Sequence, residues 1–259
     1  MNNTLVTSFK QEHYDKYAKN MIDTFREFWP KSVKLVIYFE GGPPPLSDEG
    51  NIFWRKTSEI EGHDEWMRDI APFDFLNGKT PQGYDIQHDA RHARKALTEM
   101  QGCKDYGGKV WWIDGDFITH QKVPEGWLDE VLPDDKFCAY CGRENPDGTP
   151  WMYPETGFIG FNSEHGMYEP FMQAYREIFR SGIIFTCKGW HDCYGFDAIR
   201  QLFNQPTHFV NLSKDVRAMH PIINSVLGTY LDHKKGPRKD SRSTNEDLVI
   251  QRTEPYWNE

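Results

Sequence analysis

Two aspartates stand at the end of an apolar stretch, in the segment Val110-Trp-Trp-Ile-Asp-Gly-Asp116. Asp114 and Asp116 are spaced i, i+2, and Gly115 lets the chain turn sharply so that both carboxylates can face one point. Hard divalent cations such as Mg²⁺ and Mn²⁺ prefer oxygen ligands and commonly bridge carboxylates to a diphosphate. Asp-Gly-Asp is also an ordinary turn sequence, so the metal-binding interpretation depends on the elements that surround it.

Those elements predict an α/β fold. A short β-prone segment at 4–9 precedes a helix whose apolar positions recur in steps of three and four as far as residue 28. A nearly continuous apolar strand follows at 33–39, which is typical of a strand buried in a parallel sheet. This βαβ unit, the helix predicted at 89–100 and the buried strand at 109–113 place the aspartates at a strand end, where open α/β sheets bind ligands.

The rest of the chain is predicted to hold shorter elements. Residues 46–88 predict loops and short helices, and residues 233–259 are polar and predict irregular structure. The further strands and helices are expected, in chain order, at 136–140, 156–162, 168–179 and 192–203.

The composition limits the class of protein. The chain has 259 residues, a hydrophobic content of 38%, an aromatic content of 15% and a formal net charge of −9. This acidity disfavours broad binding to nucleic acid or to anionic membranes, although the stretch 234–242 is locally basic. Five cysteines, without a secretory signal or an apolar run near the roughly 20 residues of a membrane span, predict a soluble, cytoplasmic protein with free thiols.

The segment Trp112-Ile-Asp-Gly-Asp116, which closes a βαβ half, resembles the Asp-x-Asp motif of the GT-A class of glycosyltransferases, and the resemblance covers most of residues 4–239. It implies a Rossmann-like nucleotide-binding half and a mixed central sheet flanked by helices. The implied reaction is metal-dependent transfer of a sugar from a nucleotide-diphosphate-sugar, foremost a UDP-sugar, to a hydroxyl, with Mn²⁺ or Mg²⁺ at the aspartates. The implied division is a nucleotide-sugar-binding half at 1–117, an acceptor-binding half at 118–239 and a C-terminal tail at 240–259.

The resemblance also gives a role to a histidine near the C-terminus. Some GT-A enzymes supply a third metal ligand from a C-terminal loop, in which a glycine and a lysine contact the diphosphate. His233, Gly236 and Lys239 stand three residues apart, at a similar spacing. His220 is a competing ligand, and a solvated basic stretch is the alternative for the whole segment.

Basic residues on the helix before the motif are the implied contacts of the nucleotide or its phosphates. They are Arg91, Arg94 and Lys95. A solvated helix face is the alternative interpretation of the same pattern.

Two segments are candidates for the acceptor site. Glu155 and Thr156 begin a strand that resembles the strand where donor sugar meets acceptor, and both can hydrogen-bond sugar hydroxyls. A core strand whose glycines allow close packing is the alternative. Further along, Trp190 and His191 are expected to shape the acceptor pocket.

Asp192 is the candidate catalytic residue. In an inverting enzyme it would take the proton from the acceptor hydroxyl as a general base, and in a retaining enzyme it would orient the sugar instead. A helix N-cap is the structural alternative.

Other hypotheses stay open. A nucleotidyltransferase would normally carry a glycine-rich basic loop after the first strand, and Thr7-Ser-Phe-Lys-Gln11 has no glycine. A non-catalytic carbohydrate-binding protein is disfavoured by the intact aspartates. A zinc site formed by Cys138, Cys141, His191 and Cys193 has one pair at the usual spacing and one pair at an atypical spacing. The acceptor is expected to be a glycan or another sugar first, and a hydroxymethylated base in DNA second.

Overall fold

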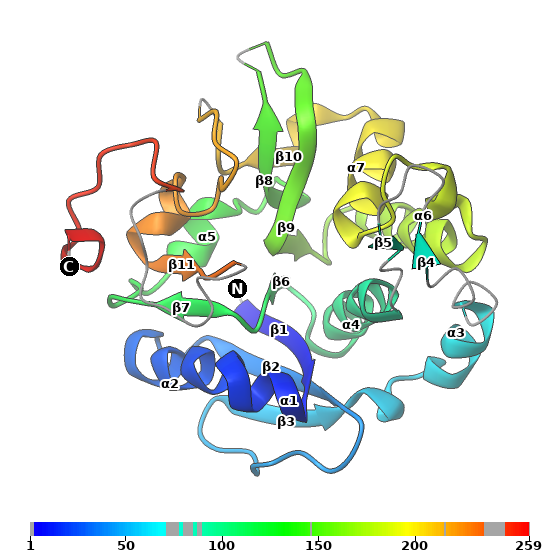
Figure 1. Cartoon of the computed structure of the whole chain (residues 1–259), viewed down its shortest axis with the longest axis horizontal. Coiled ribbons are helices and arrows are strands. Elements are labelled where there is room, and N and C mark those ends of the chain that lie inside the picture. The colour runs from blue at the N-terminus through cyan, green and yellow to red at the C-terminus, as the bar shows by residue number, and fades with distance from the viewer. Residues whose placement is uncertain are drawn as a thin grey trace.

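The computed structural model describes residues 3–70, 78–79, 85–86, 90–145, 147–214, 216–235 and 247–258. Within these residues the fold is α/β, and a seven-stranded mixed sheet lies between two groups of helices (Figure 1). This confirms the fold class expected from the sequence. Among the described residues, none of the helices combines the length and the apolar character that crossing a lipid bilayer requires.

The strands are β1 (Asn3–Lys10), β2 (Lys34–Glu40), β3 (Ile52–Lys56), β4 (Gly78–Lys79), β5 (Asp85–Ile86), β6 (Lys109–Ile113), β7 (Phe117–Thr119), β8 (Cys138–Glu144), β9 (Pro150–Asn162), β10 (Phe209–Asn211) and β11 (Leu231–His233). The helices are α1 (Gln11–His13), the π-helical turn η1 (Tyr14–Ala18), α2 (Lys19–Phe28), α3 (His63–Ile70), α4 (Ala90–Tyr106), α5 (Trp127–Val131), α6 (Tyr168–Arg180) and α7 (Asp192–Phe203). Short 3-10 helices lie at Thr57–Glu59, Ile183–Thr186, Pro206–His208, Val226–Thr229 and Pro255–Asn258.

The central sheet has the strand order β10-β8-β9-β6-β1-β2-β3. Strands β6, β1, β2 and β3 are parallel, whereas β9 runs antiparallel to both β6 and β8. A separate antiparallel pair, β7 with β11, follows directly after the end of β6. The carboxyl end of β6 therefore lies where the parallel half of the sheet meets β9 and the β7–β11 pair.

Alternating side chains of the strands pack into two cores, one on each face of the sheet. Leu5 and Trp111 face α2 and α5 on one side, and Val6 and Trp112 face α4, α6 and α7 on the other. Successive side chains of a strand point to opposite faces, and both faces are covered, which explains why strands β1, β2 and β6 are buried at nearly every position. The predictions of a strand buried on both faces at 33–39 and of a buried strand at 109–113 are confirmed.

Two local predictions were wrong. Residues 46–88 were expected to hold no strand, yet β3 forms the edge of the central sheet beside β2. Helix α4 was expected to end at Met100 and continues to Tyr106. Gly102 lies within the longer helix and allows α4 to pack closely on β1, because a Cβ at this position would lie 2.7 Å from Cγ1 of Val6.

The last described residues pack onto the β7–β11 pair. Trp257 is buried and its indole Nε1 donates a hydrogen bond to Gly228 O at 2.9 Å. The Tyr256 hydroxyl donates to Asp232 Oδ2 at 2.8 Å, and its ring stacks on His120 with 4.4 Å between centroids. Residues 247–258 thus have little regular structure, as predicted, but they hold β11 in place.

Candidate functional site

Asp114 leaves the end of β6 and is fixed by three contacts. Its backbone N–H donates to Gly157 O at 2.9 Å, which continues the β6–β9 pairing by one residue. The indole Nε1 of Trp112 donates to Asp114 Oδ1 at 2.5 Å, and Lys95 Nζ lies 3.8 Å from the same oxygen. The side chain remains one-third exposed, so this carboxylate is both held in position and accessible to a ligand.

Asp116 immediately precedes β7, and His233 ends its partner strand β11. Register places His233 opposite Phe117, and the two rings stack with 4.4 Å between centroids and 15° between planes. His233 Nε2 lies 3.1 Å from Asp116 Oδ1 and 3.6 Å from Asp114 Oδ2. The structure therefore brings together the three side chains that the resemblance assigned to the metal.

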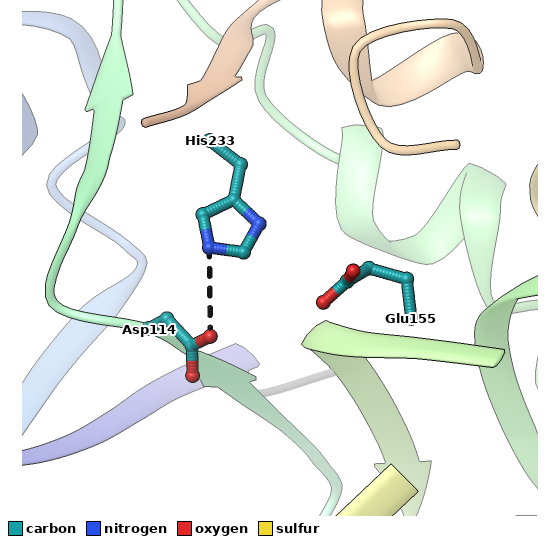
Figure 2. A group of neighbouring side chains, drawn as sticks. All are labelled: Asp114, Glu155 and His233. Carbon is teal, nitrogen blue, oxygen red and sulfur yellow. Dashed lines mark ion pairs between the residues drawn. The ribbon is translucent and has the colours of Figure 1, made fainter. Parts of the chain in front are cut away.

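Glu155 joins these groups from β9 (Figure 2). One ligand atom each from Asp114, Glu155 and His233 lie within 4.8 Å of one another, and among the described residues no other group of three or more metal-ligating side chains is this compact. We call these three residues the carboxylate–histidine cluster. Glu155 was expected at the sugar rather than among the metal ligands, and β9 places its carboxylate beside Asp114 and His233.

Glycine is required at position 157 to make room for this cluster. A Cβ there would lie 2.6 Å from His233 Cε1 and 3.0 Å from Asp114 Oδ2. Two carboxylates and an imidazole around a space that a methyl group would fill form a donor set suited to a small divalent cation. The residues present therefore fit the Mn²⁺ or Mg²⁺ that the resemblance implies.

Nearby positively charged side chains affect the pKa values of Asp114 and Glu155 differently. Burial raises the pKa of Asp114, and Asp116 raises it further, although Lys95 and His233 oppose this. Burial acts to raise the pKa of Glu155, but Lys235, His233 and Arg143 together outweigh burial and lower this pKa to about 2.

Lys235 and Arg143 both hold Glu155 directly. Lys235 Nζ donates to Glu155 Oε2, and Arg143 Nη2 donates to the same oxygen at 3.2 Å. Arg143 is itself buried and also donates to the backbone oxygens of Tyr153 and Met219. Sequence analysis missed both basic residues, because nothing local in the sequence shows that β8 and the chain after β11 meet at Glu155.

Lys95 and Asp192 form a second charged group beside the cluster. Lys95 Nζ lies 2.7 Å from Asp192 Oδ2 and donates to Thr156 O at 2.7 Å. The Thr156 hydroxyl donates to Asp192 Oδ2 at 2.5 Å, and His92 Nδ1 lies 2.9 Å from Asp192 Oδ1. Although burial opposes it, Lys95 together with His92 holds the pKa of Asp192 well below its usual range.

This arrangement corrects the structural alternative for Asp192. The N-cap of α7 is His191, and Asp192 is the first residue inside the helix. Its carboxylate contacts other elements instead of the helix backbone. His92 was missed by sequence analysis, although its position three residues before Lys95 places both on one face of α4.

The other predicted residues make contacts with neighbours outside the cluster. Arg94 Nη1 donates to Glu40 Oε2 at 2.9 Å. The Trp190 ring packs edge-on against Phe185 with 4.9 Å between centroids, and the His191 ring lies 4.5 Å from that of His92. Their predicted contacts with nucleotide and acceptor stay predictions.

Some predicted residues lie outside what the structure describes. Gly236 and Lys239 are beyond the described residues, and of Arg91 only the backbone, in the first turn of α4, is described. The competing ligand His220 lines a small pocket that Glu155 and His233 also line, and its Nε2 lies 3.6 Å from Asp247 Oδ1.

The cysteines do not form the zinc site that their spacing allowed. Cys138 belongs to the core on one face of the sheet and Cys141 to the core on the other, so their thiols cannot share a ligand. Burial raises the pKa of both thiols. All five cysteines are free, and the buried ones are core residues.

No family model and no curated protein sequence matches the chain. Among solved structures, the crystal structure of mouse xyloside xylosyltransferase 1 in its apo form is similar, with a TM-score of 0.53 over 82% of this chain and 86% of that chain. The sequence identity is 12%, so the likeness concerns the fold. The chain thus has an α/β fold that resembles that of a glycosyltransferase, with a cluster of carboxylates and an imidazole at the carboxyl edge of its sheet.

Proposed function

We propose that this protein is a metal-dependent glycosyltransferase of the GT-A kind, which moves a sugar from a nucleotide-diphosphate-sugar to a hydroxyl acceptor. The observation that carries the proposal is the carboxylate–histidine cluster, because its members converge from β6, β9 and β11 at the strand ends of a glycosyltransferase-like fold. Open α/β sheets bind their ligands at this edge.

The cation would be held by Asp114, Glu155 and His233. Asp116, whose Oδ1 lies 3.1 Å from His233 Nε2, would complete or orient this ligand set. When bound, Mn²⁺ or Mg²⁺ offsets the negative charge that develops on the departing diphosphate. Lys235, which donates to Glu155, is proposed to supply a positive charge for the diphosphate, the role that the resemblance gives to Lys239.

The Lys95–Asp192 pair is proposed to orient the sugar. Both carboxylate oxygens of Asp192 already have hydrogen-bond or ion-pair partners. Its lowered pKa also makes it a weak proton acceptor. A poised general base normally has a pKa near the working pH. Orientation of the sugar is therefore the better-supported of the two roles considered for Asp192.

The acceptor is proposed to be a glycan or another sugar. Thr156 donates to Asp192, Trp190 precedes Asp192 by two residues, and aromatic and hydroxyl side chains of this kind are common in saccharide sites. A hydroxymethylated base in DNA is a less favoured acceptor, because the net charge of −9 opposes the phosphate backbone.

The decisive experiment is a panel of UDP-, GDP- and ADP-sugars with Mn²⁺, in which release of the nucleoside diphosphate is measured with and without oligosaccharide acceptors. We expect one donor to be cleaved, and we expect Asp114→Ala and Asp116→Ala to lower the rate by roughly 100-fold or more. A chelator should lower the wild-type rate to the same level.

Asp105→Asn serves as the matched control, because Asp105 lies at the end of α4 and contacts Tyr38 and Gln101 rather than the cluster. It should keep the wild-type rate. Full activity of both alanine variants would show that the metal assignment is wrong, and cleavage of no donor would contradict the proposed function itself.

A further inference from the structure

One ring nitrogen of His92 has no hydrogen-bond partner among the described residues. Nδ1 lies 2.9 Å from Asp192 Oδ1, whereas Nε2 is buried and unpaired within the part of the chain that the structure describes. Buried polar atoms in native proteins are nearly always hydrogen-bonded, and an unpaired one calls for an explanation. A bound ligand that supplies the missing partner is such an explanation.

Asp192 determines what kind of partner Nε2 needs. Its lowered pKa keeps Asp192 ionised, so it can only accept hydrogen bonds. The proton of a neutral His92 ring therefore resides on Nδ1, and Nε2 carries a lone pair. A group that donates a hydrogen bond, such as a hydroxyl, is the matching partner.

The position of His92 links it to the carboxylate–histidine cluster. Lys95, one turn further along α4, contacts Asp192 with Nζ at 2.7 Å and Asp114 at 3.8 Å. Thr156, which donates to Asp192, directly follows Glu155 in β9. The Asp192–His92 pair and the cluster are therefore two sides of one charged site, separated by a single ammonium group.

We infer that His92 Nε2 accepts a hydrogen bond from a hydroxyl of a saccharide bound at this site. The inference rests on the proposed function and adds a substrate-binding residue to it. The hydroxyl has two possible sources, namely the sugar being transferred or the attacking group of the acceptor.

The second source makes His92 a proton acceptor in the reaction. The oxygen of the acceptor bonds to the anomeric carbon, and the proton of its O–H bond passes to Nε2. The bond from the anomeric carbon to the diphosphate oxygen breaks, and its electron pair leaves with the nucleoside diphosphate. The first source leaves His92 as a residue that selects sugars with a hydroxyl at one position.

The test compares His92→Ala and His92→Gln with the control His208→Gln, which changes a histidine in the short helix before β10, outside this site. Calorimetry measures binding of the nucleotide-sugar and of the nucleoside diphosphate alone, and assays measure donor cleavage and transfer. His92→Gln covers the case in which the alanine variant does not fold.

If the hydroxyl belongs to the transferred sugar, both variants should bind the nucleotide-sugar at least about tenfold more weakly and the nucleoside diphosphate unchanged. A donor lacking that hydroxyl should then bind poorly to the wild type and show no further loss with the variants. If the hydroxyl belongs to the acceptor, transfer should fall at least about tenfold while donor binding is kept, and added imidazole should restore part of the transfer in His92→Ala.

Other outcomes overturn the inference. Unchanged binding and transfer in both His92 variants would exclude a contact with substrate, and so would equal losses for the nucleotide-sugar and the nucleoside diphosphate. A wild-type protein that cleaves no nucleotide-sugar overturns the proposed function and this inference with it, whereas an active wild type with unaffected His92 variants overturns the inference alone.

Discussion

Lys95 and Asp192 form an ion pair of 2.7 Å in which each side chain is only 8% exposed. Two charges taken out of water at this depth stabilise the fold only while both are present, since either one alone would be a buried, uncompensated charge. The pair joins α4 to the start of α7 and also holds Thr156 of β9. The pair thus connects α4, α7 and β9 and is also part of the proposed site.

Replacing Lys95 by Met should therefore lower the free energy of unfolding by about 3–5 kcal/mol, as expected when one partner of a buried pair is removed. The double variant Lys95→Met with Asp192→Asn should recover part of this loss, because no unpaired charge remains. Urea unfolding measures both. Lys104→Met, at an exposed pair with Glu61, should change little. Additive losses in the double variant would contradict the coupling.

The buried carboxyl of Glu99 should make the free energy of unfolding depend on pH. Burial raises the pKa of this α4 carboxyl from 4.5 to about 8. Between these two values the unfolded chain has released the proton and the folded chain retains it, so stability falls as the pH rises from about 5 to 8. Glu99→Gln should flatten this slope, measured by urea unfolding at several pH values. The exposed Glu130→Gln variant should keep the wild-type slope, and an unchanged slope in Glu99→Gln would show that another group is responsible.

Gly157→Ala should damage the site more than the fold. The added methyl group would lie within 2.6 Å of His233 Cε1 and would push this ring away from Asp114. We expect affinity for Mn²⁺ to fall by roughly tenfold or more, by calorimetry, with donor cleavage reduced in step. Gly166→Ala is the matched control, since a Cβ there meets nothing within 4 Å. Wild-type Mn²⁺ affinity in Gly157→Ala would contradict the placement of the cation.

Tyr256→Phe tests the support that the C-terminal residues give to β11. The substitution removes the hydroxyl that donates to Asp232 and keeps the ring stacked on His120. We expect a loss of about 1–2 kcal/mol in the free energy of unfolding, together with weaker Mn²⁺ binding, because Asp232 precedes His233. Tyr38→Phe, which removes a hydroxyl that donates to Asp105 on α4, controls for the general cost of losing a tyrosine–aspartate hydrogen bond. If the variant keeps the wild-type free energy of unfolding but binds Mn²⁺ more weakly, the effect on the site is separate from the effect on the fold.

Much of the parallel half of the fold was predictable. Strands β2 and β6 are apolar at most positions, and α2 and α6 place their apolar residues at helical spacing, so local sequence alone defines them. Strand β3 was missed because only Ile52 and Trp54 of its five residues are buried, which is a weak pattern at the edge of a sheet. The predicted helix at 89–100 was too short, and Gly102 within its continuation allows close contact of α4 with Val6.

The site was predictable only for residues that are close to one another in the sequence. Asp114 and Asp116 are two residues apart, and their position at a strand end follows from the apolar run before them. The proximity of Glu155 depends on β9 running antiparallel to β6, which no local pattern reveals. The same is true of His92, whose significance comes from a contact with Asp192, 100 residues away.

The ligands of the carboxylate–histidine cluster come from β6, β9 and β11, and His233 is 117 residues beyond Asp116. During synthesis on the ribosome, the strand with Asp114 emerges long before the histidine does. A nascent chain therefore cannot assemble this constellation until β11 has left the exit tunnel and paired with β7. The complete cluster thus exists only in a chain whose distant parts have already docked.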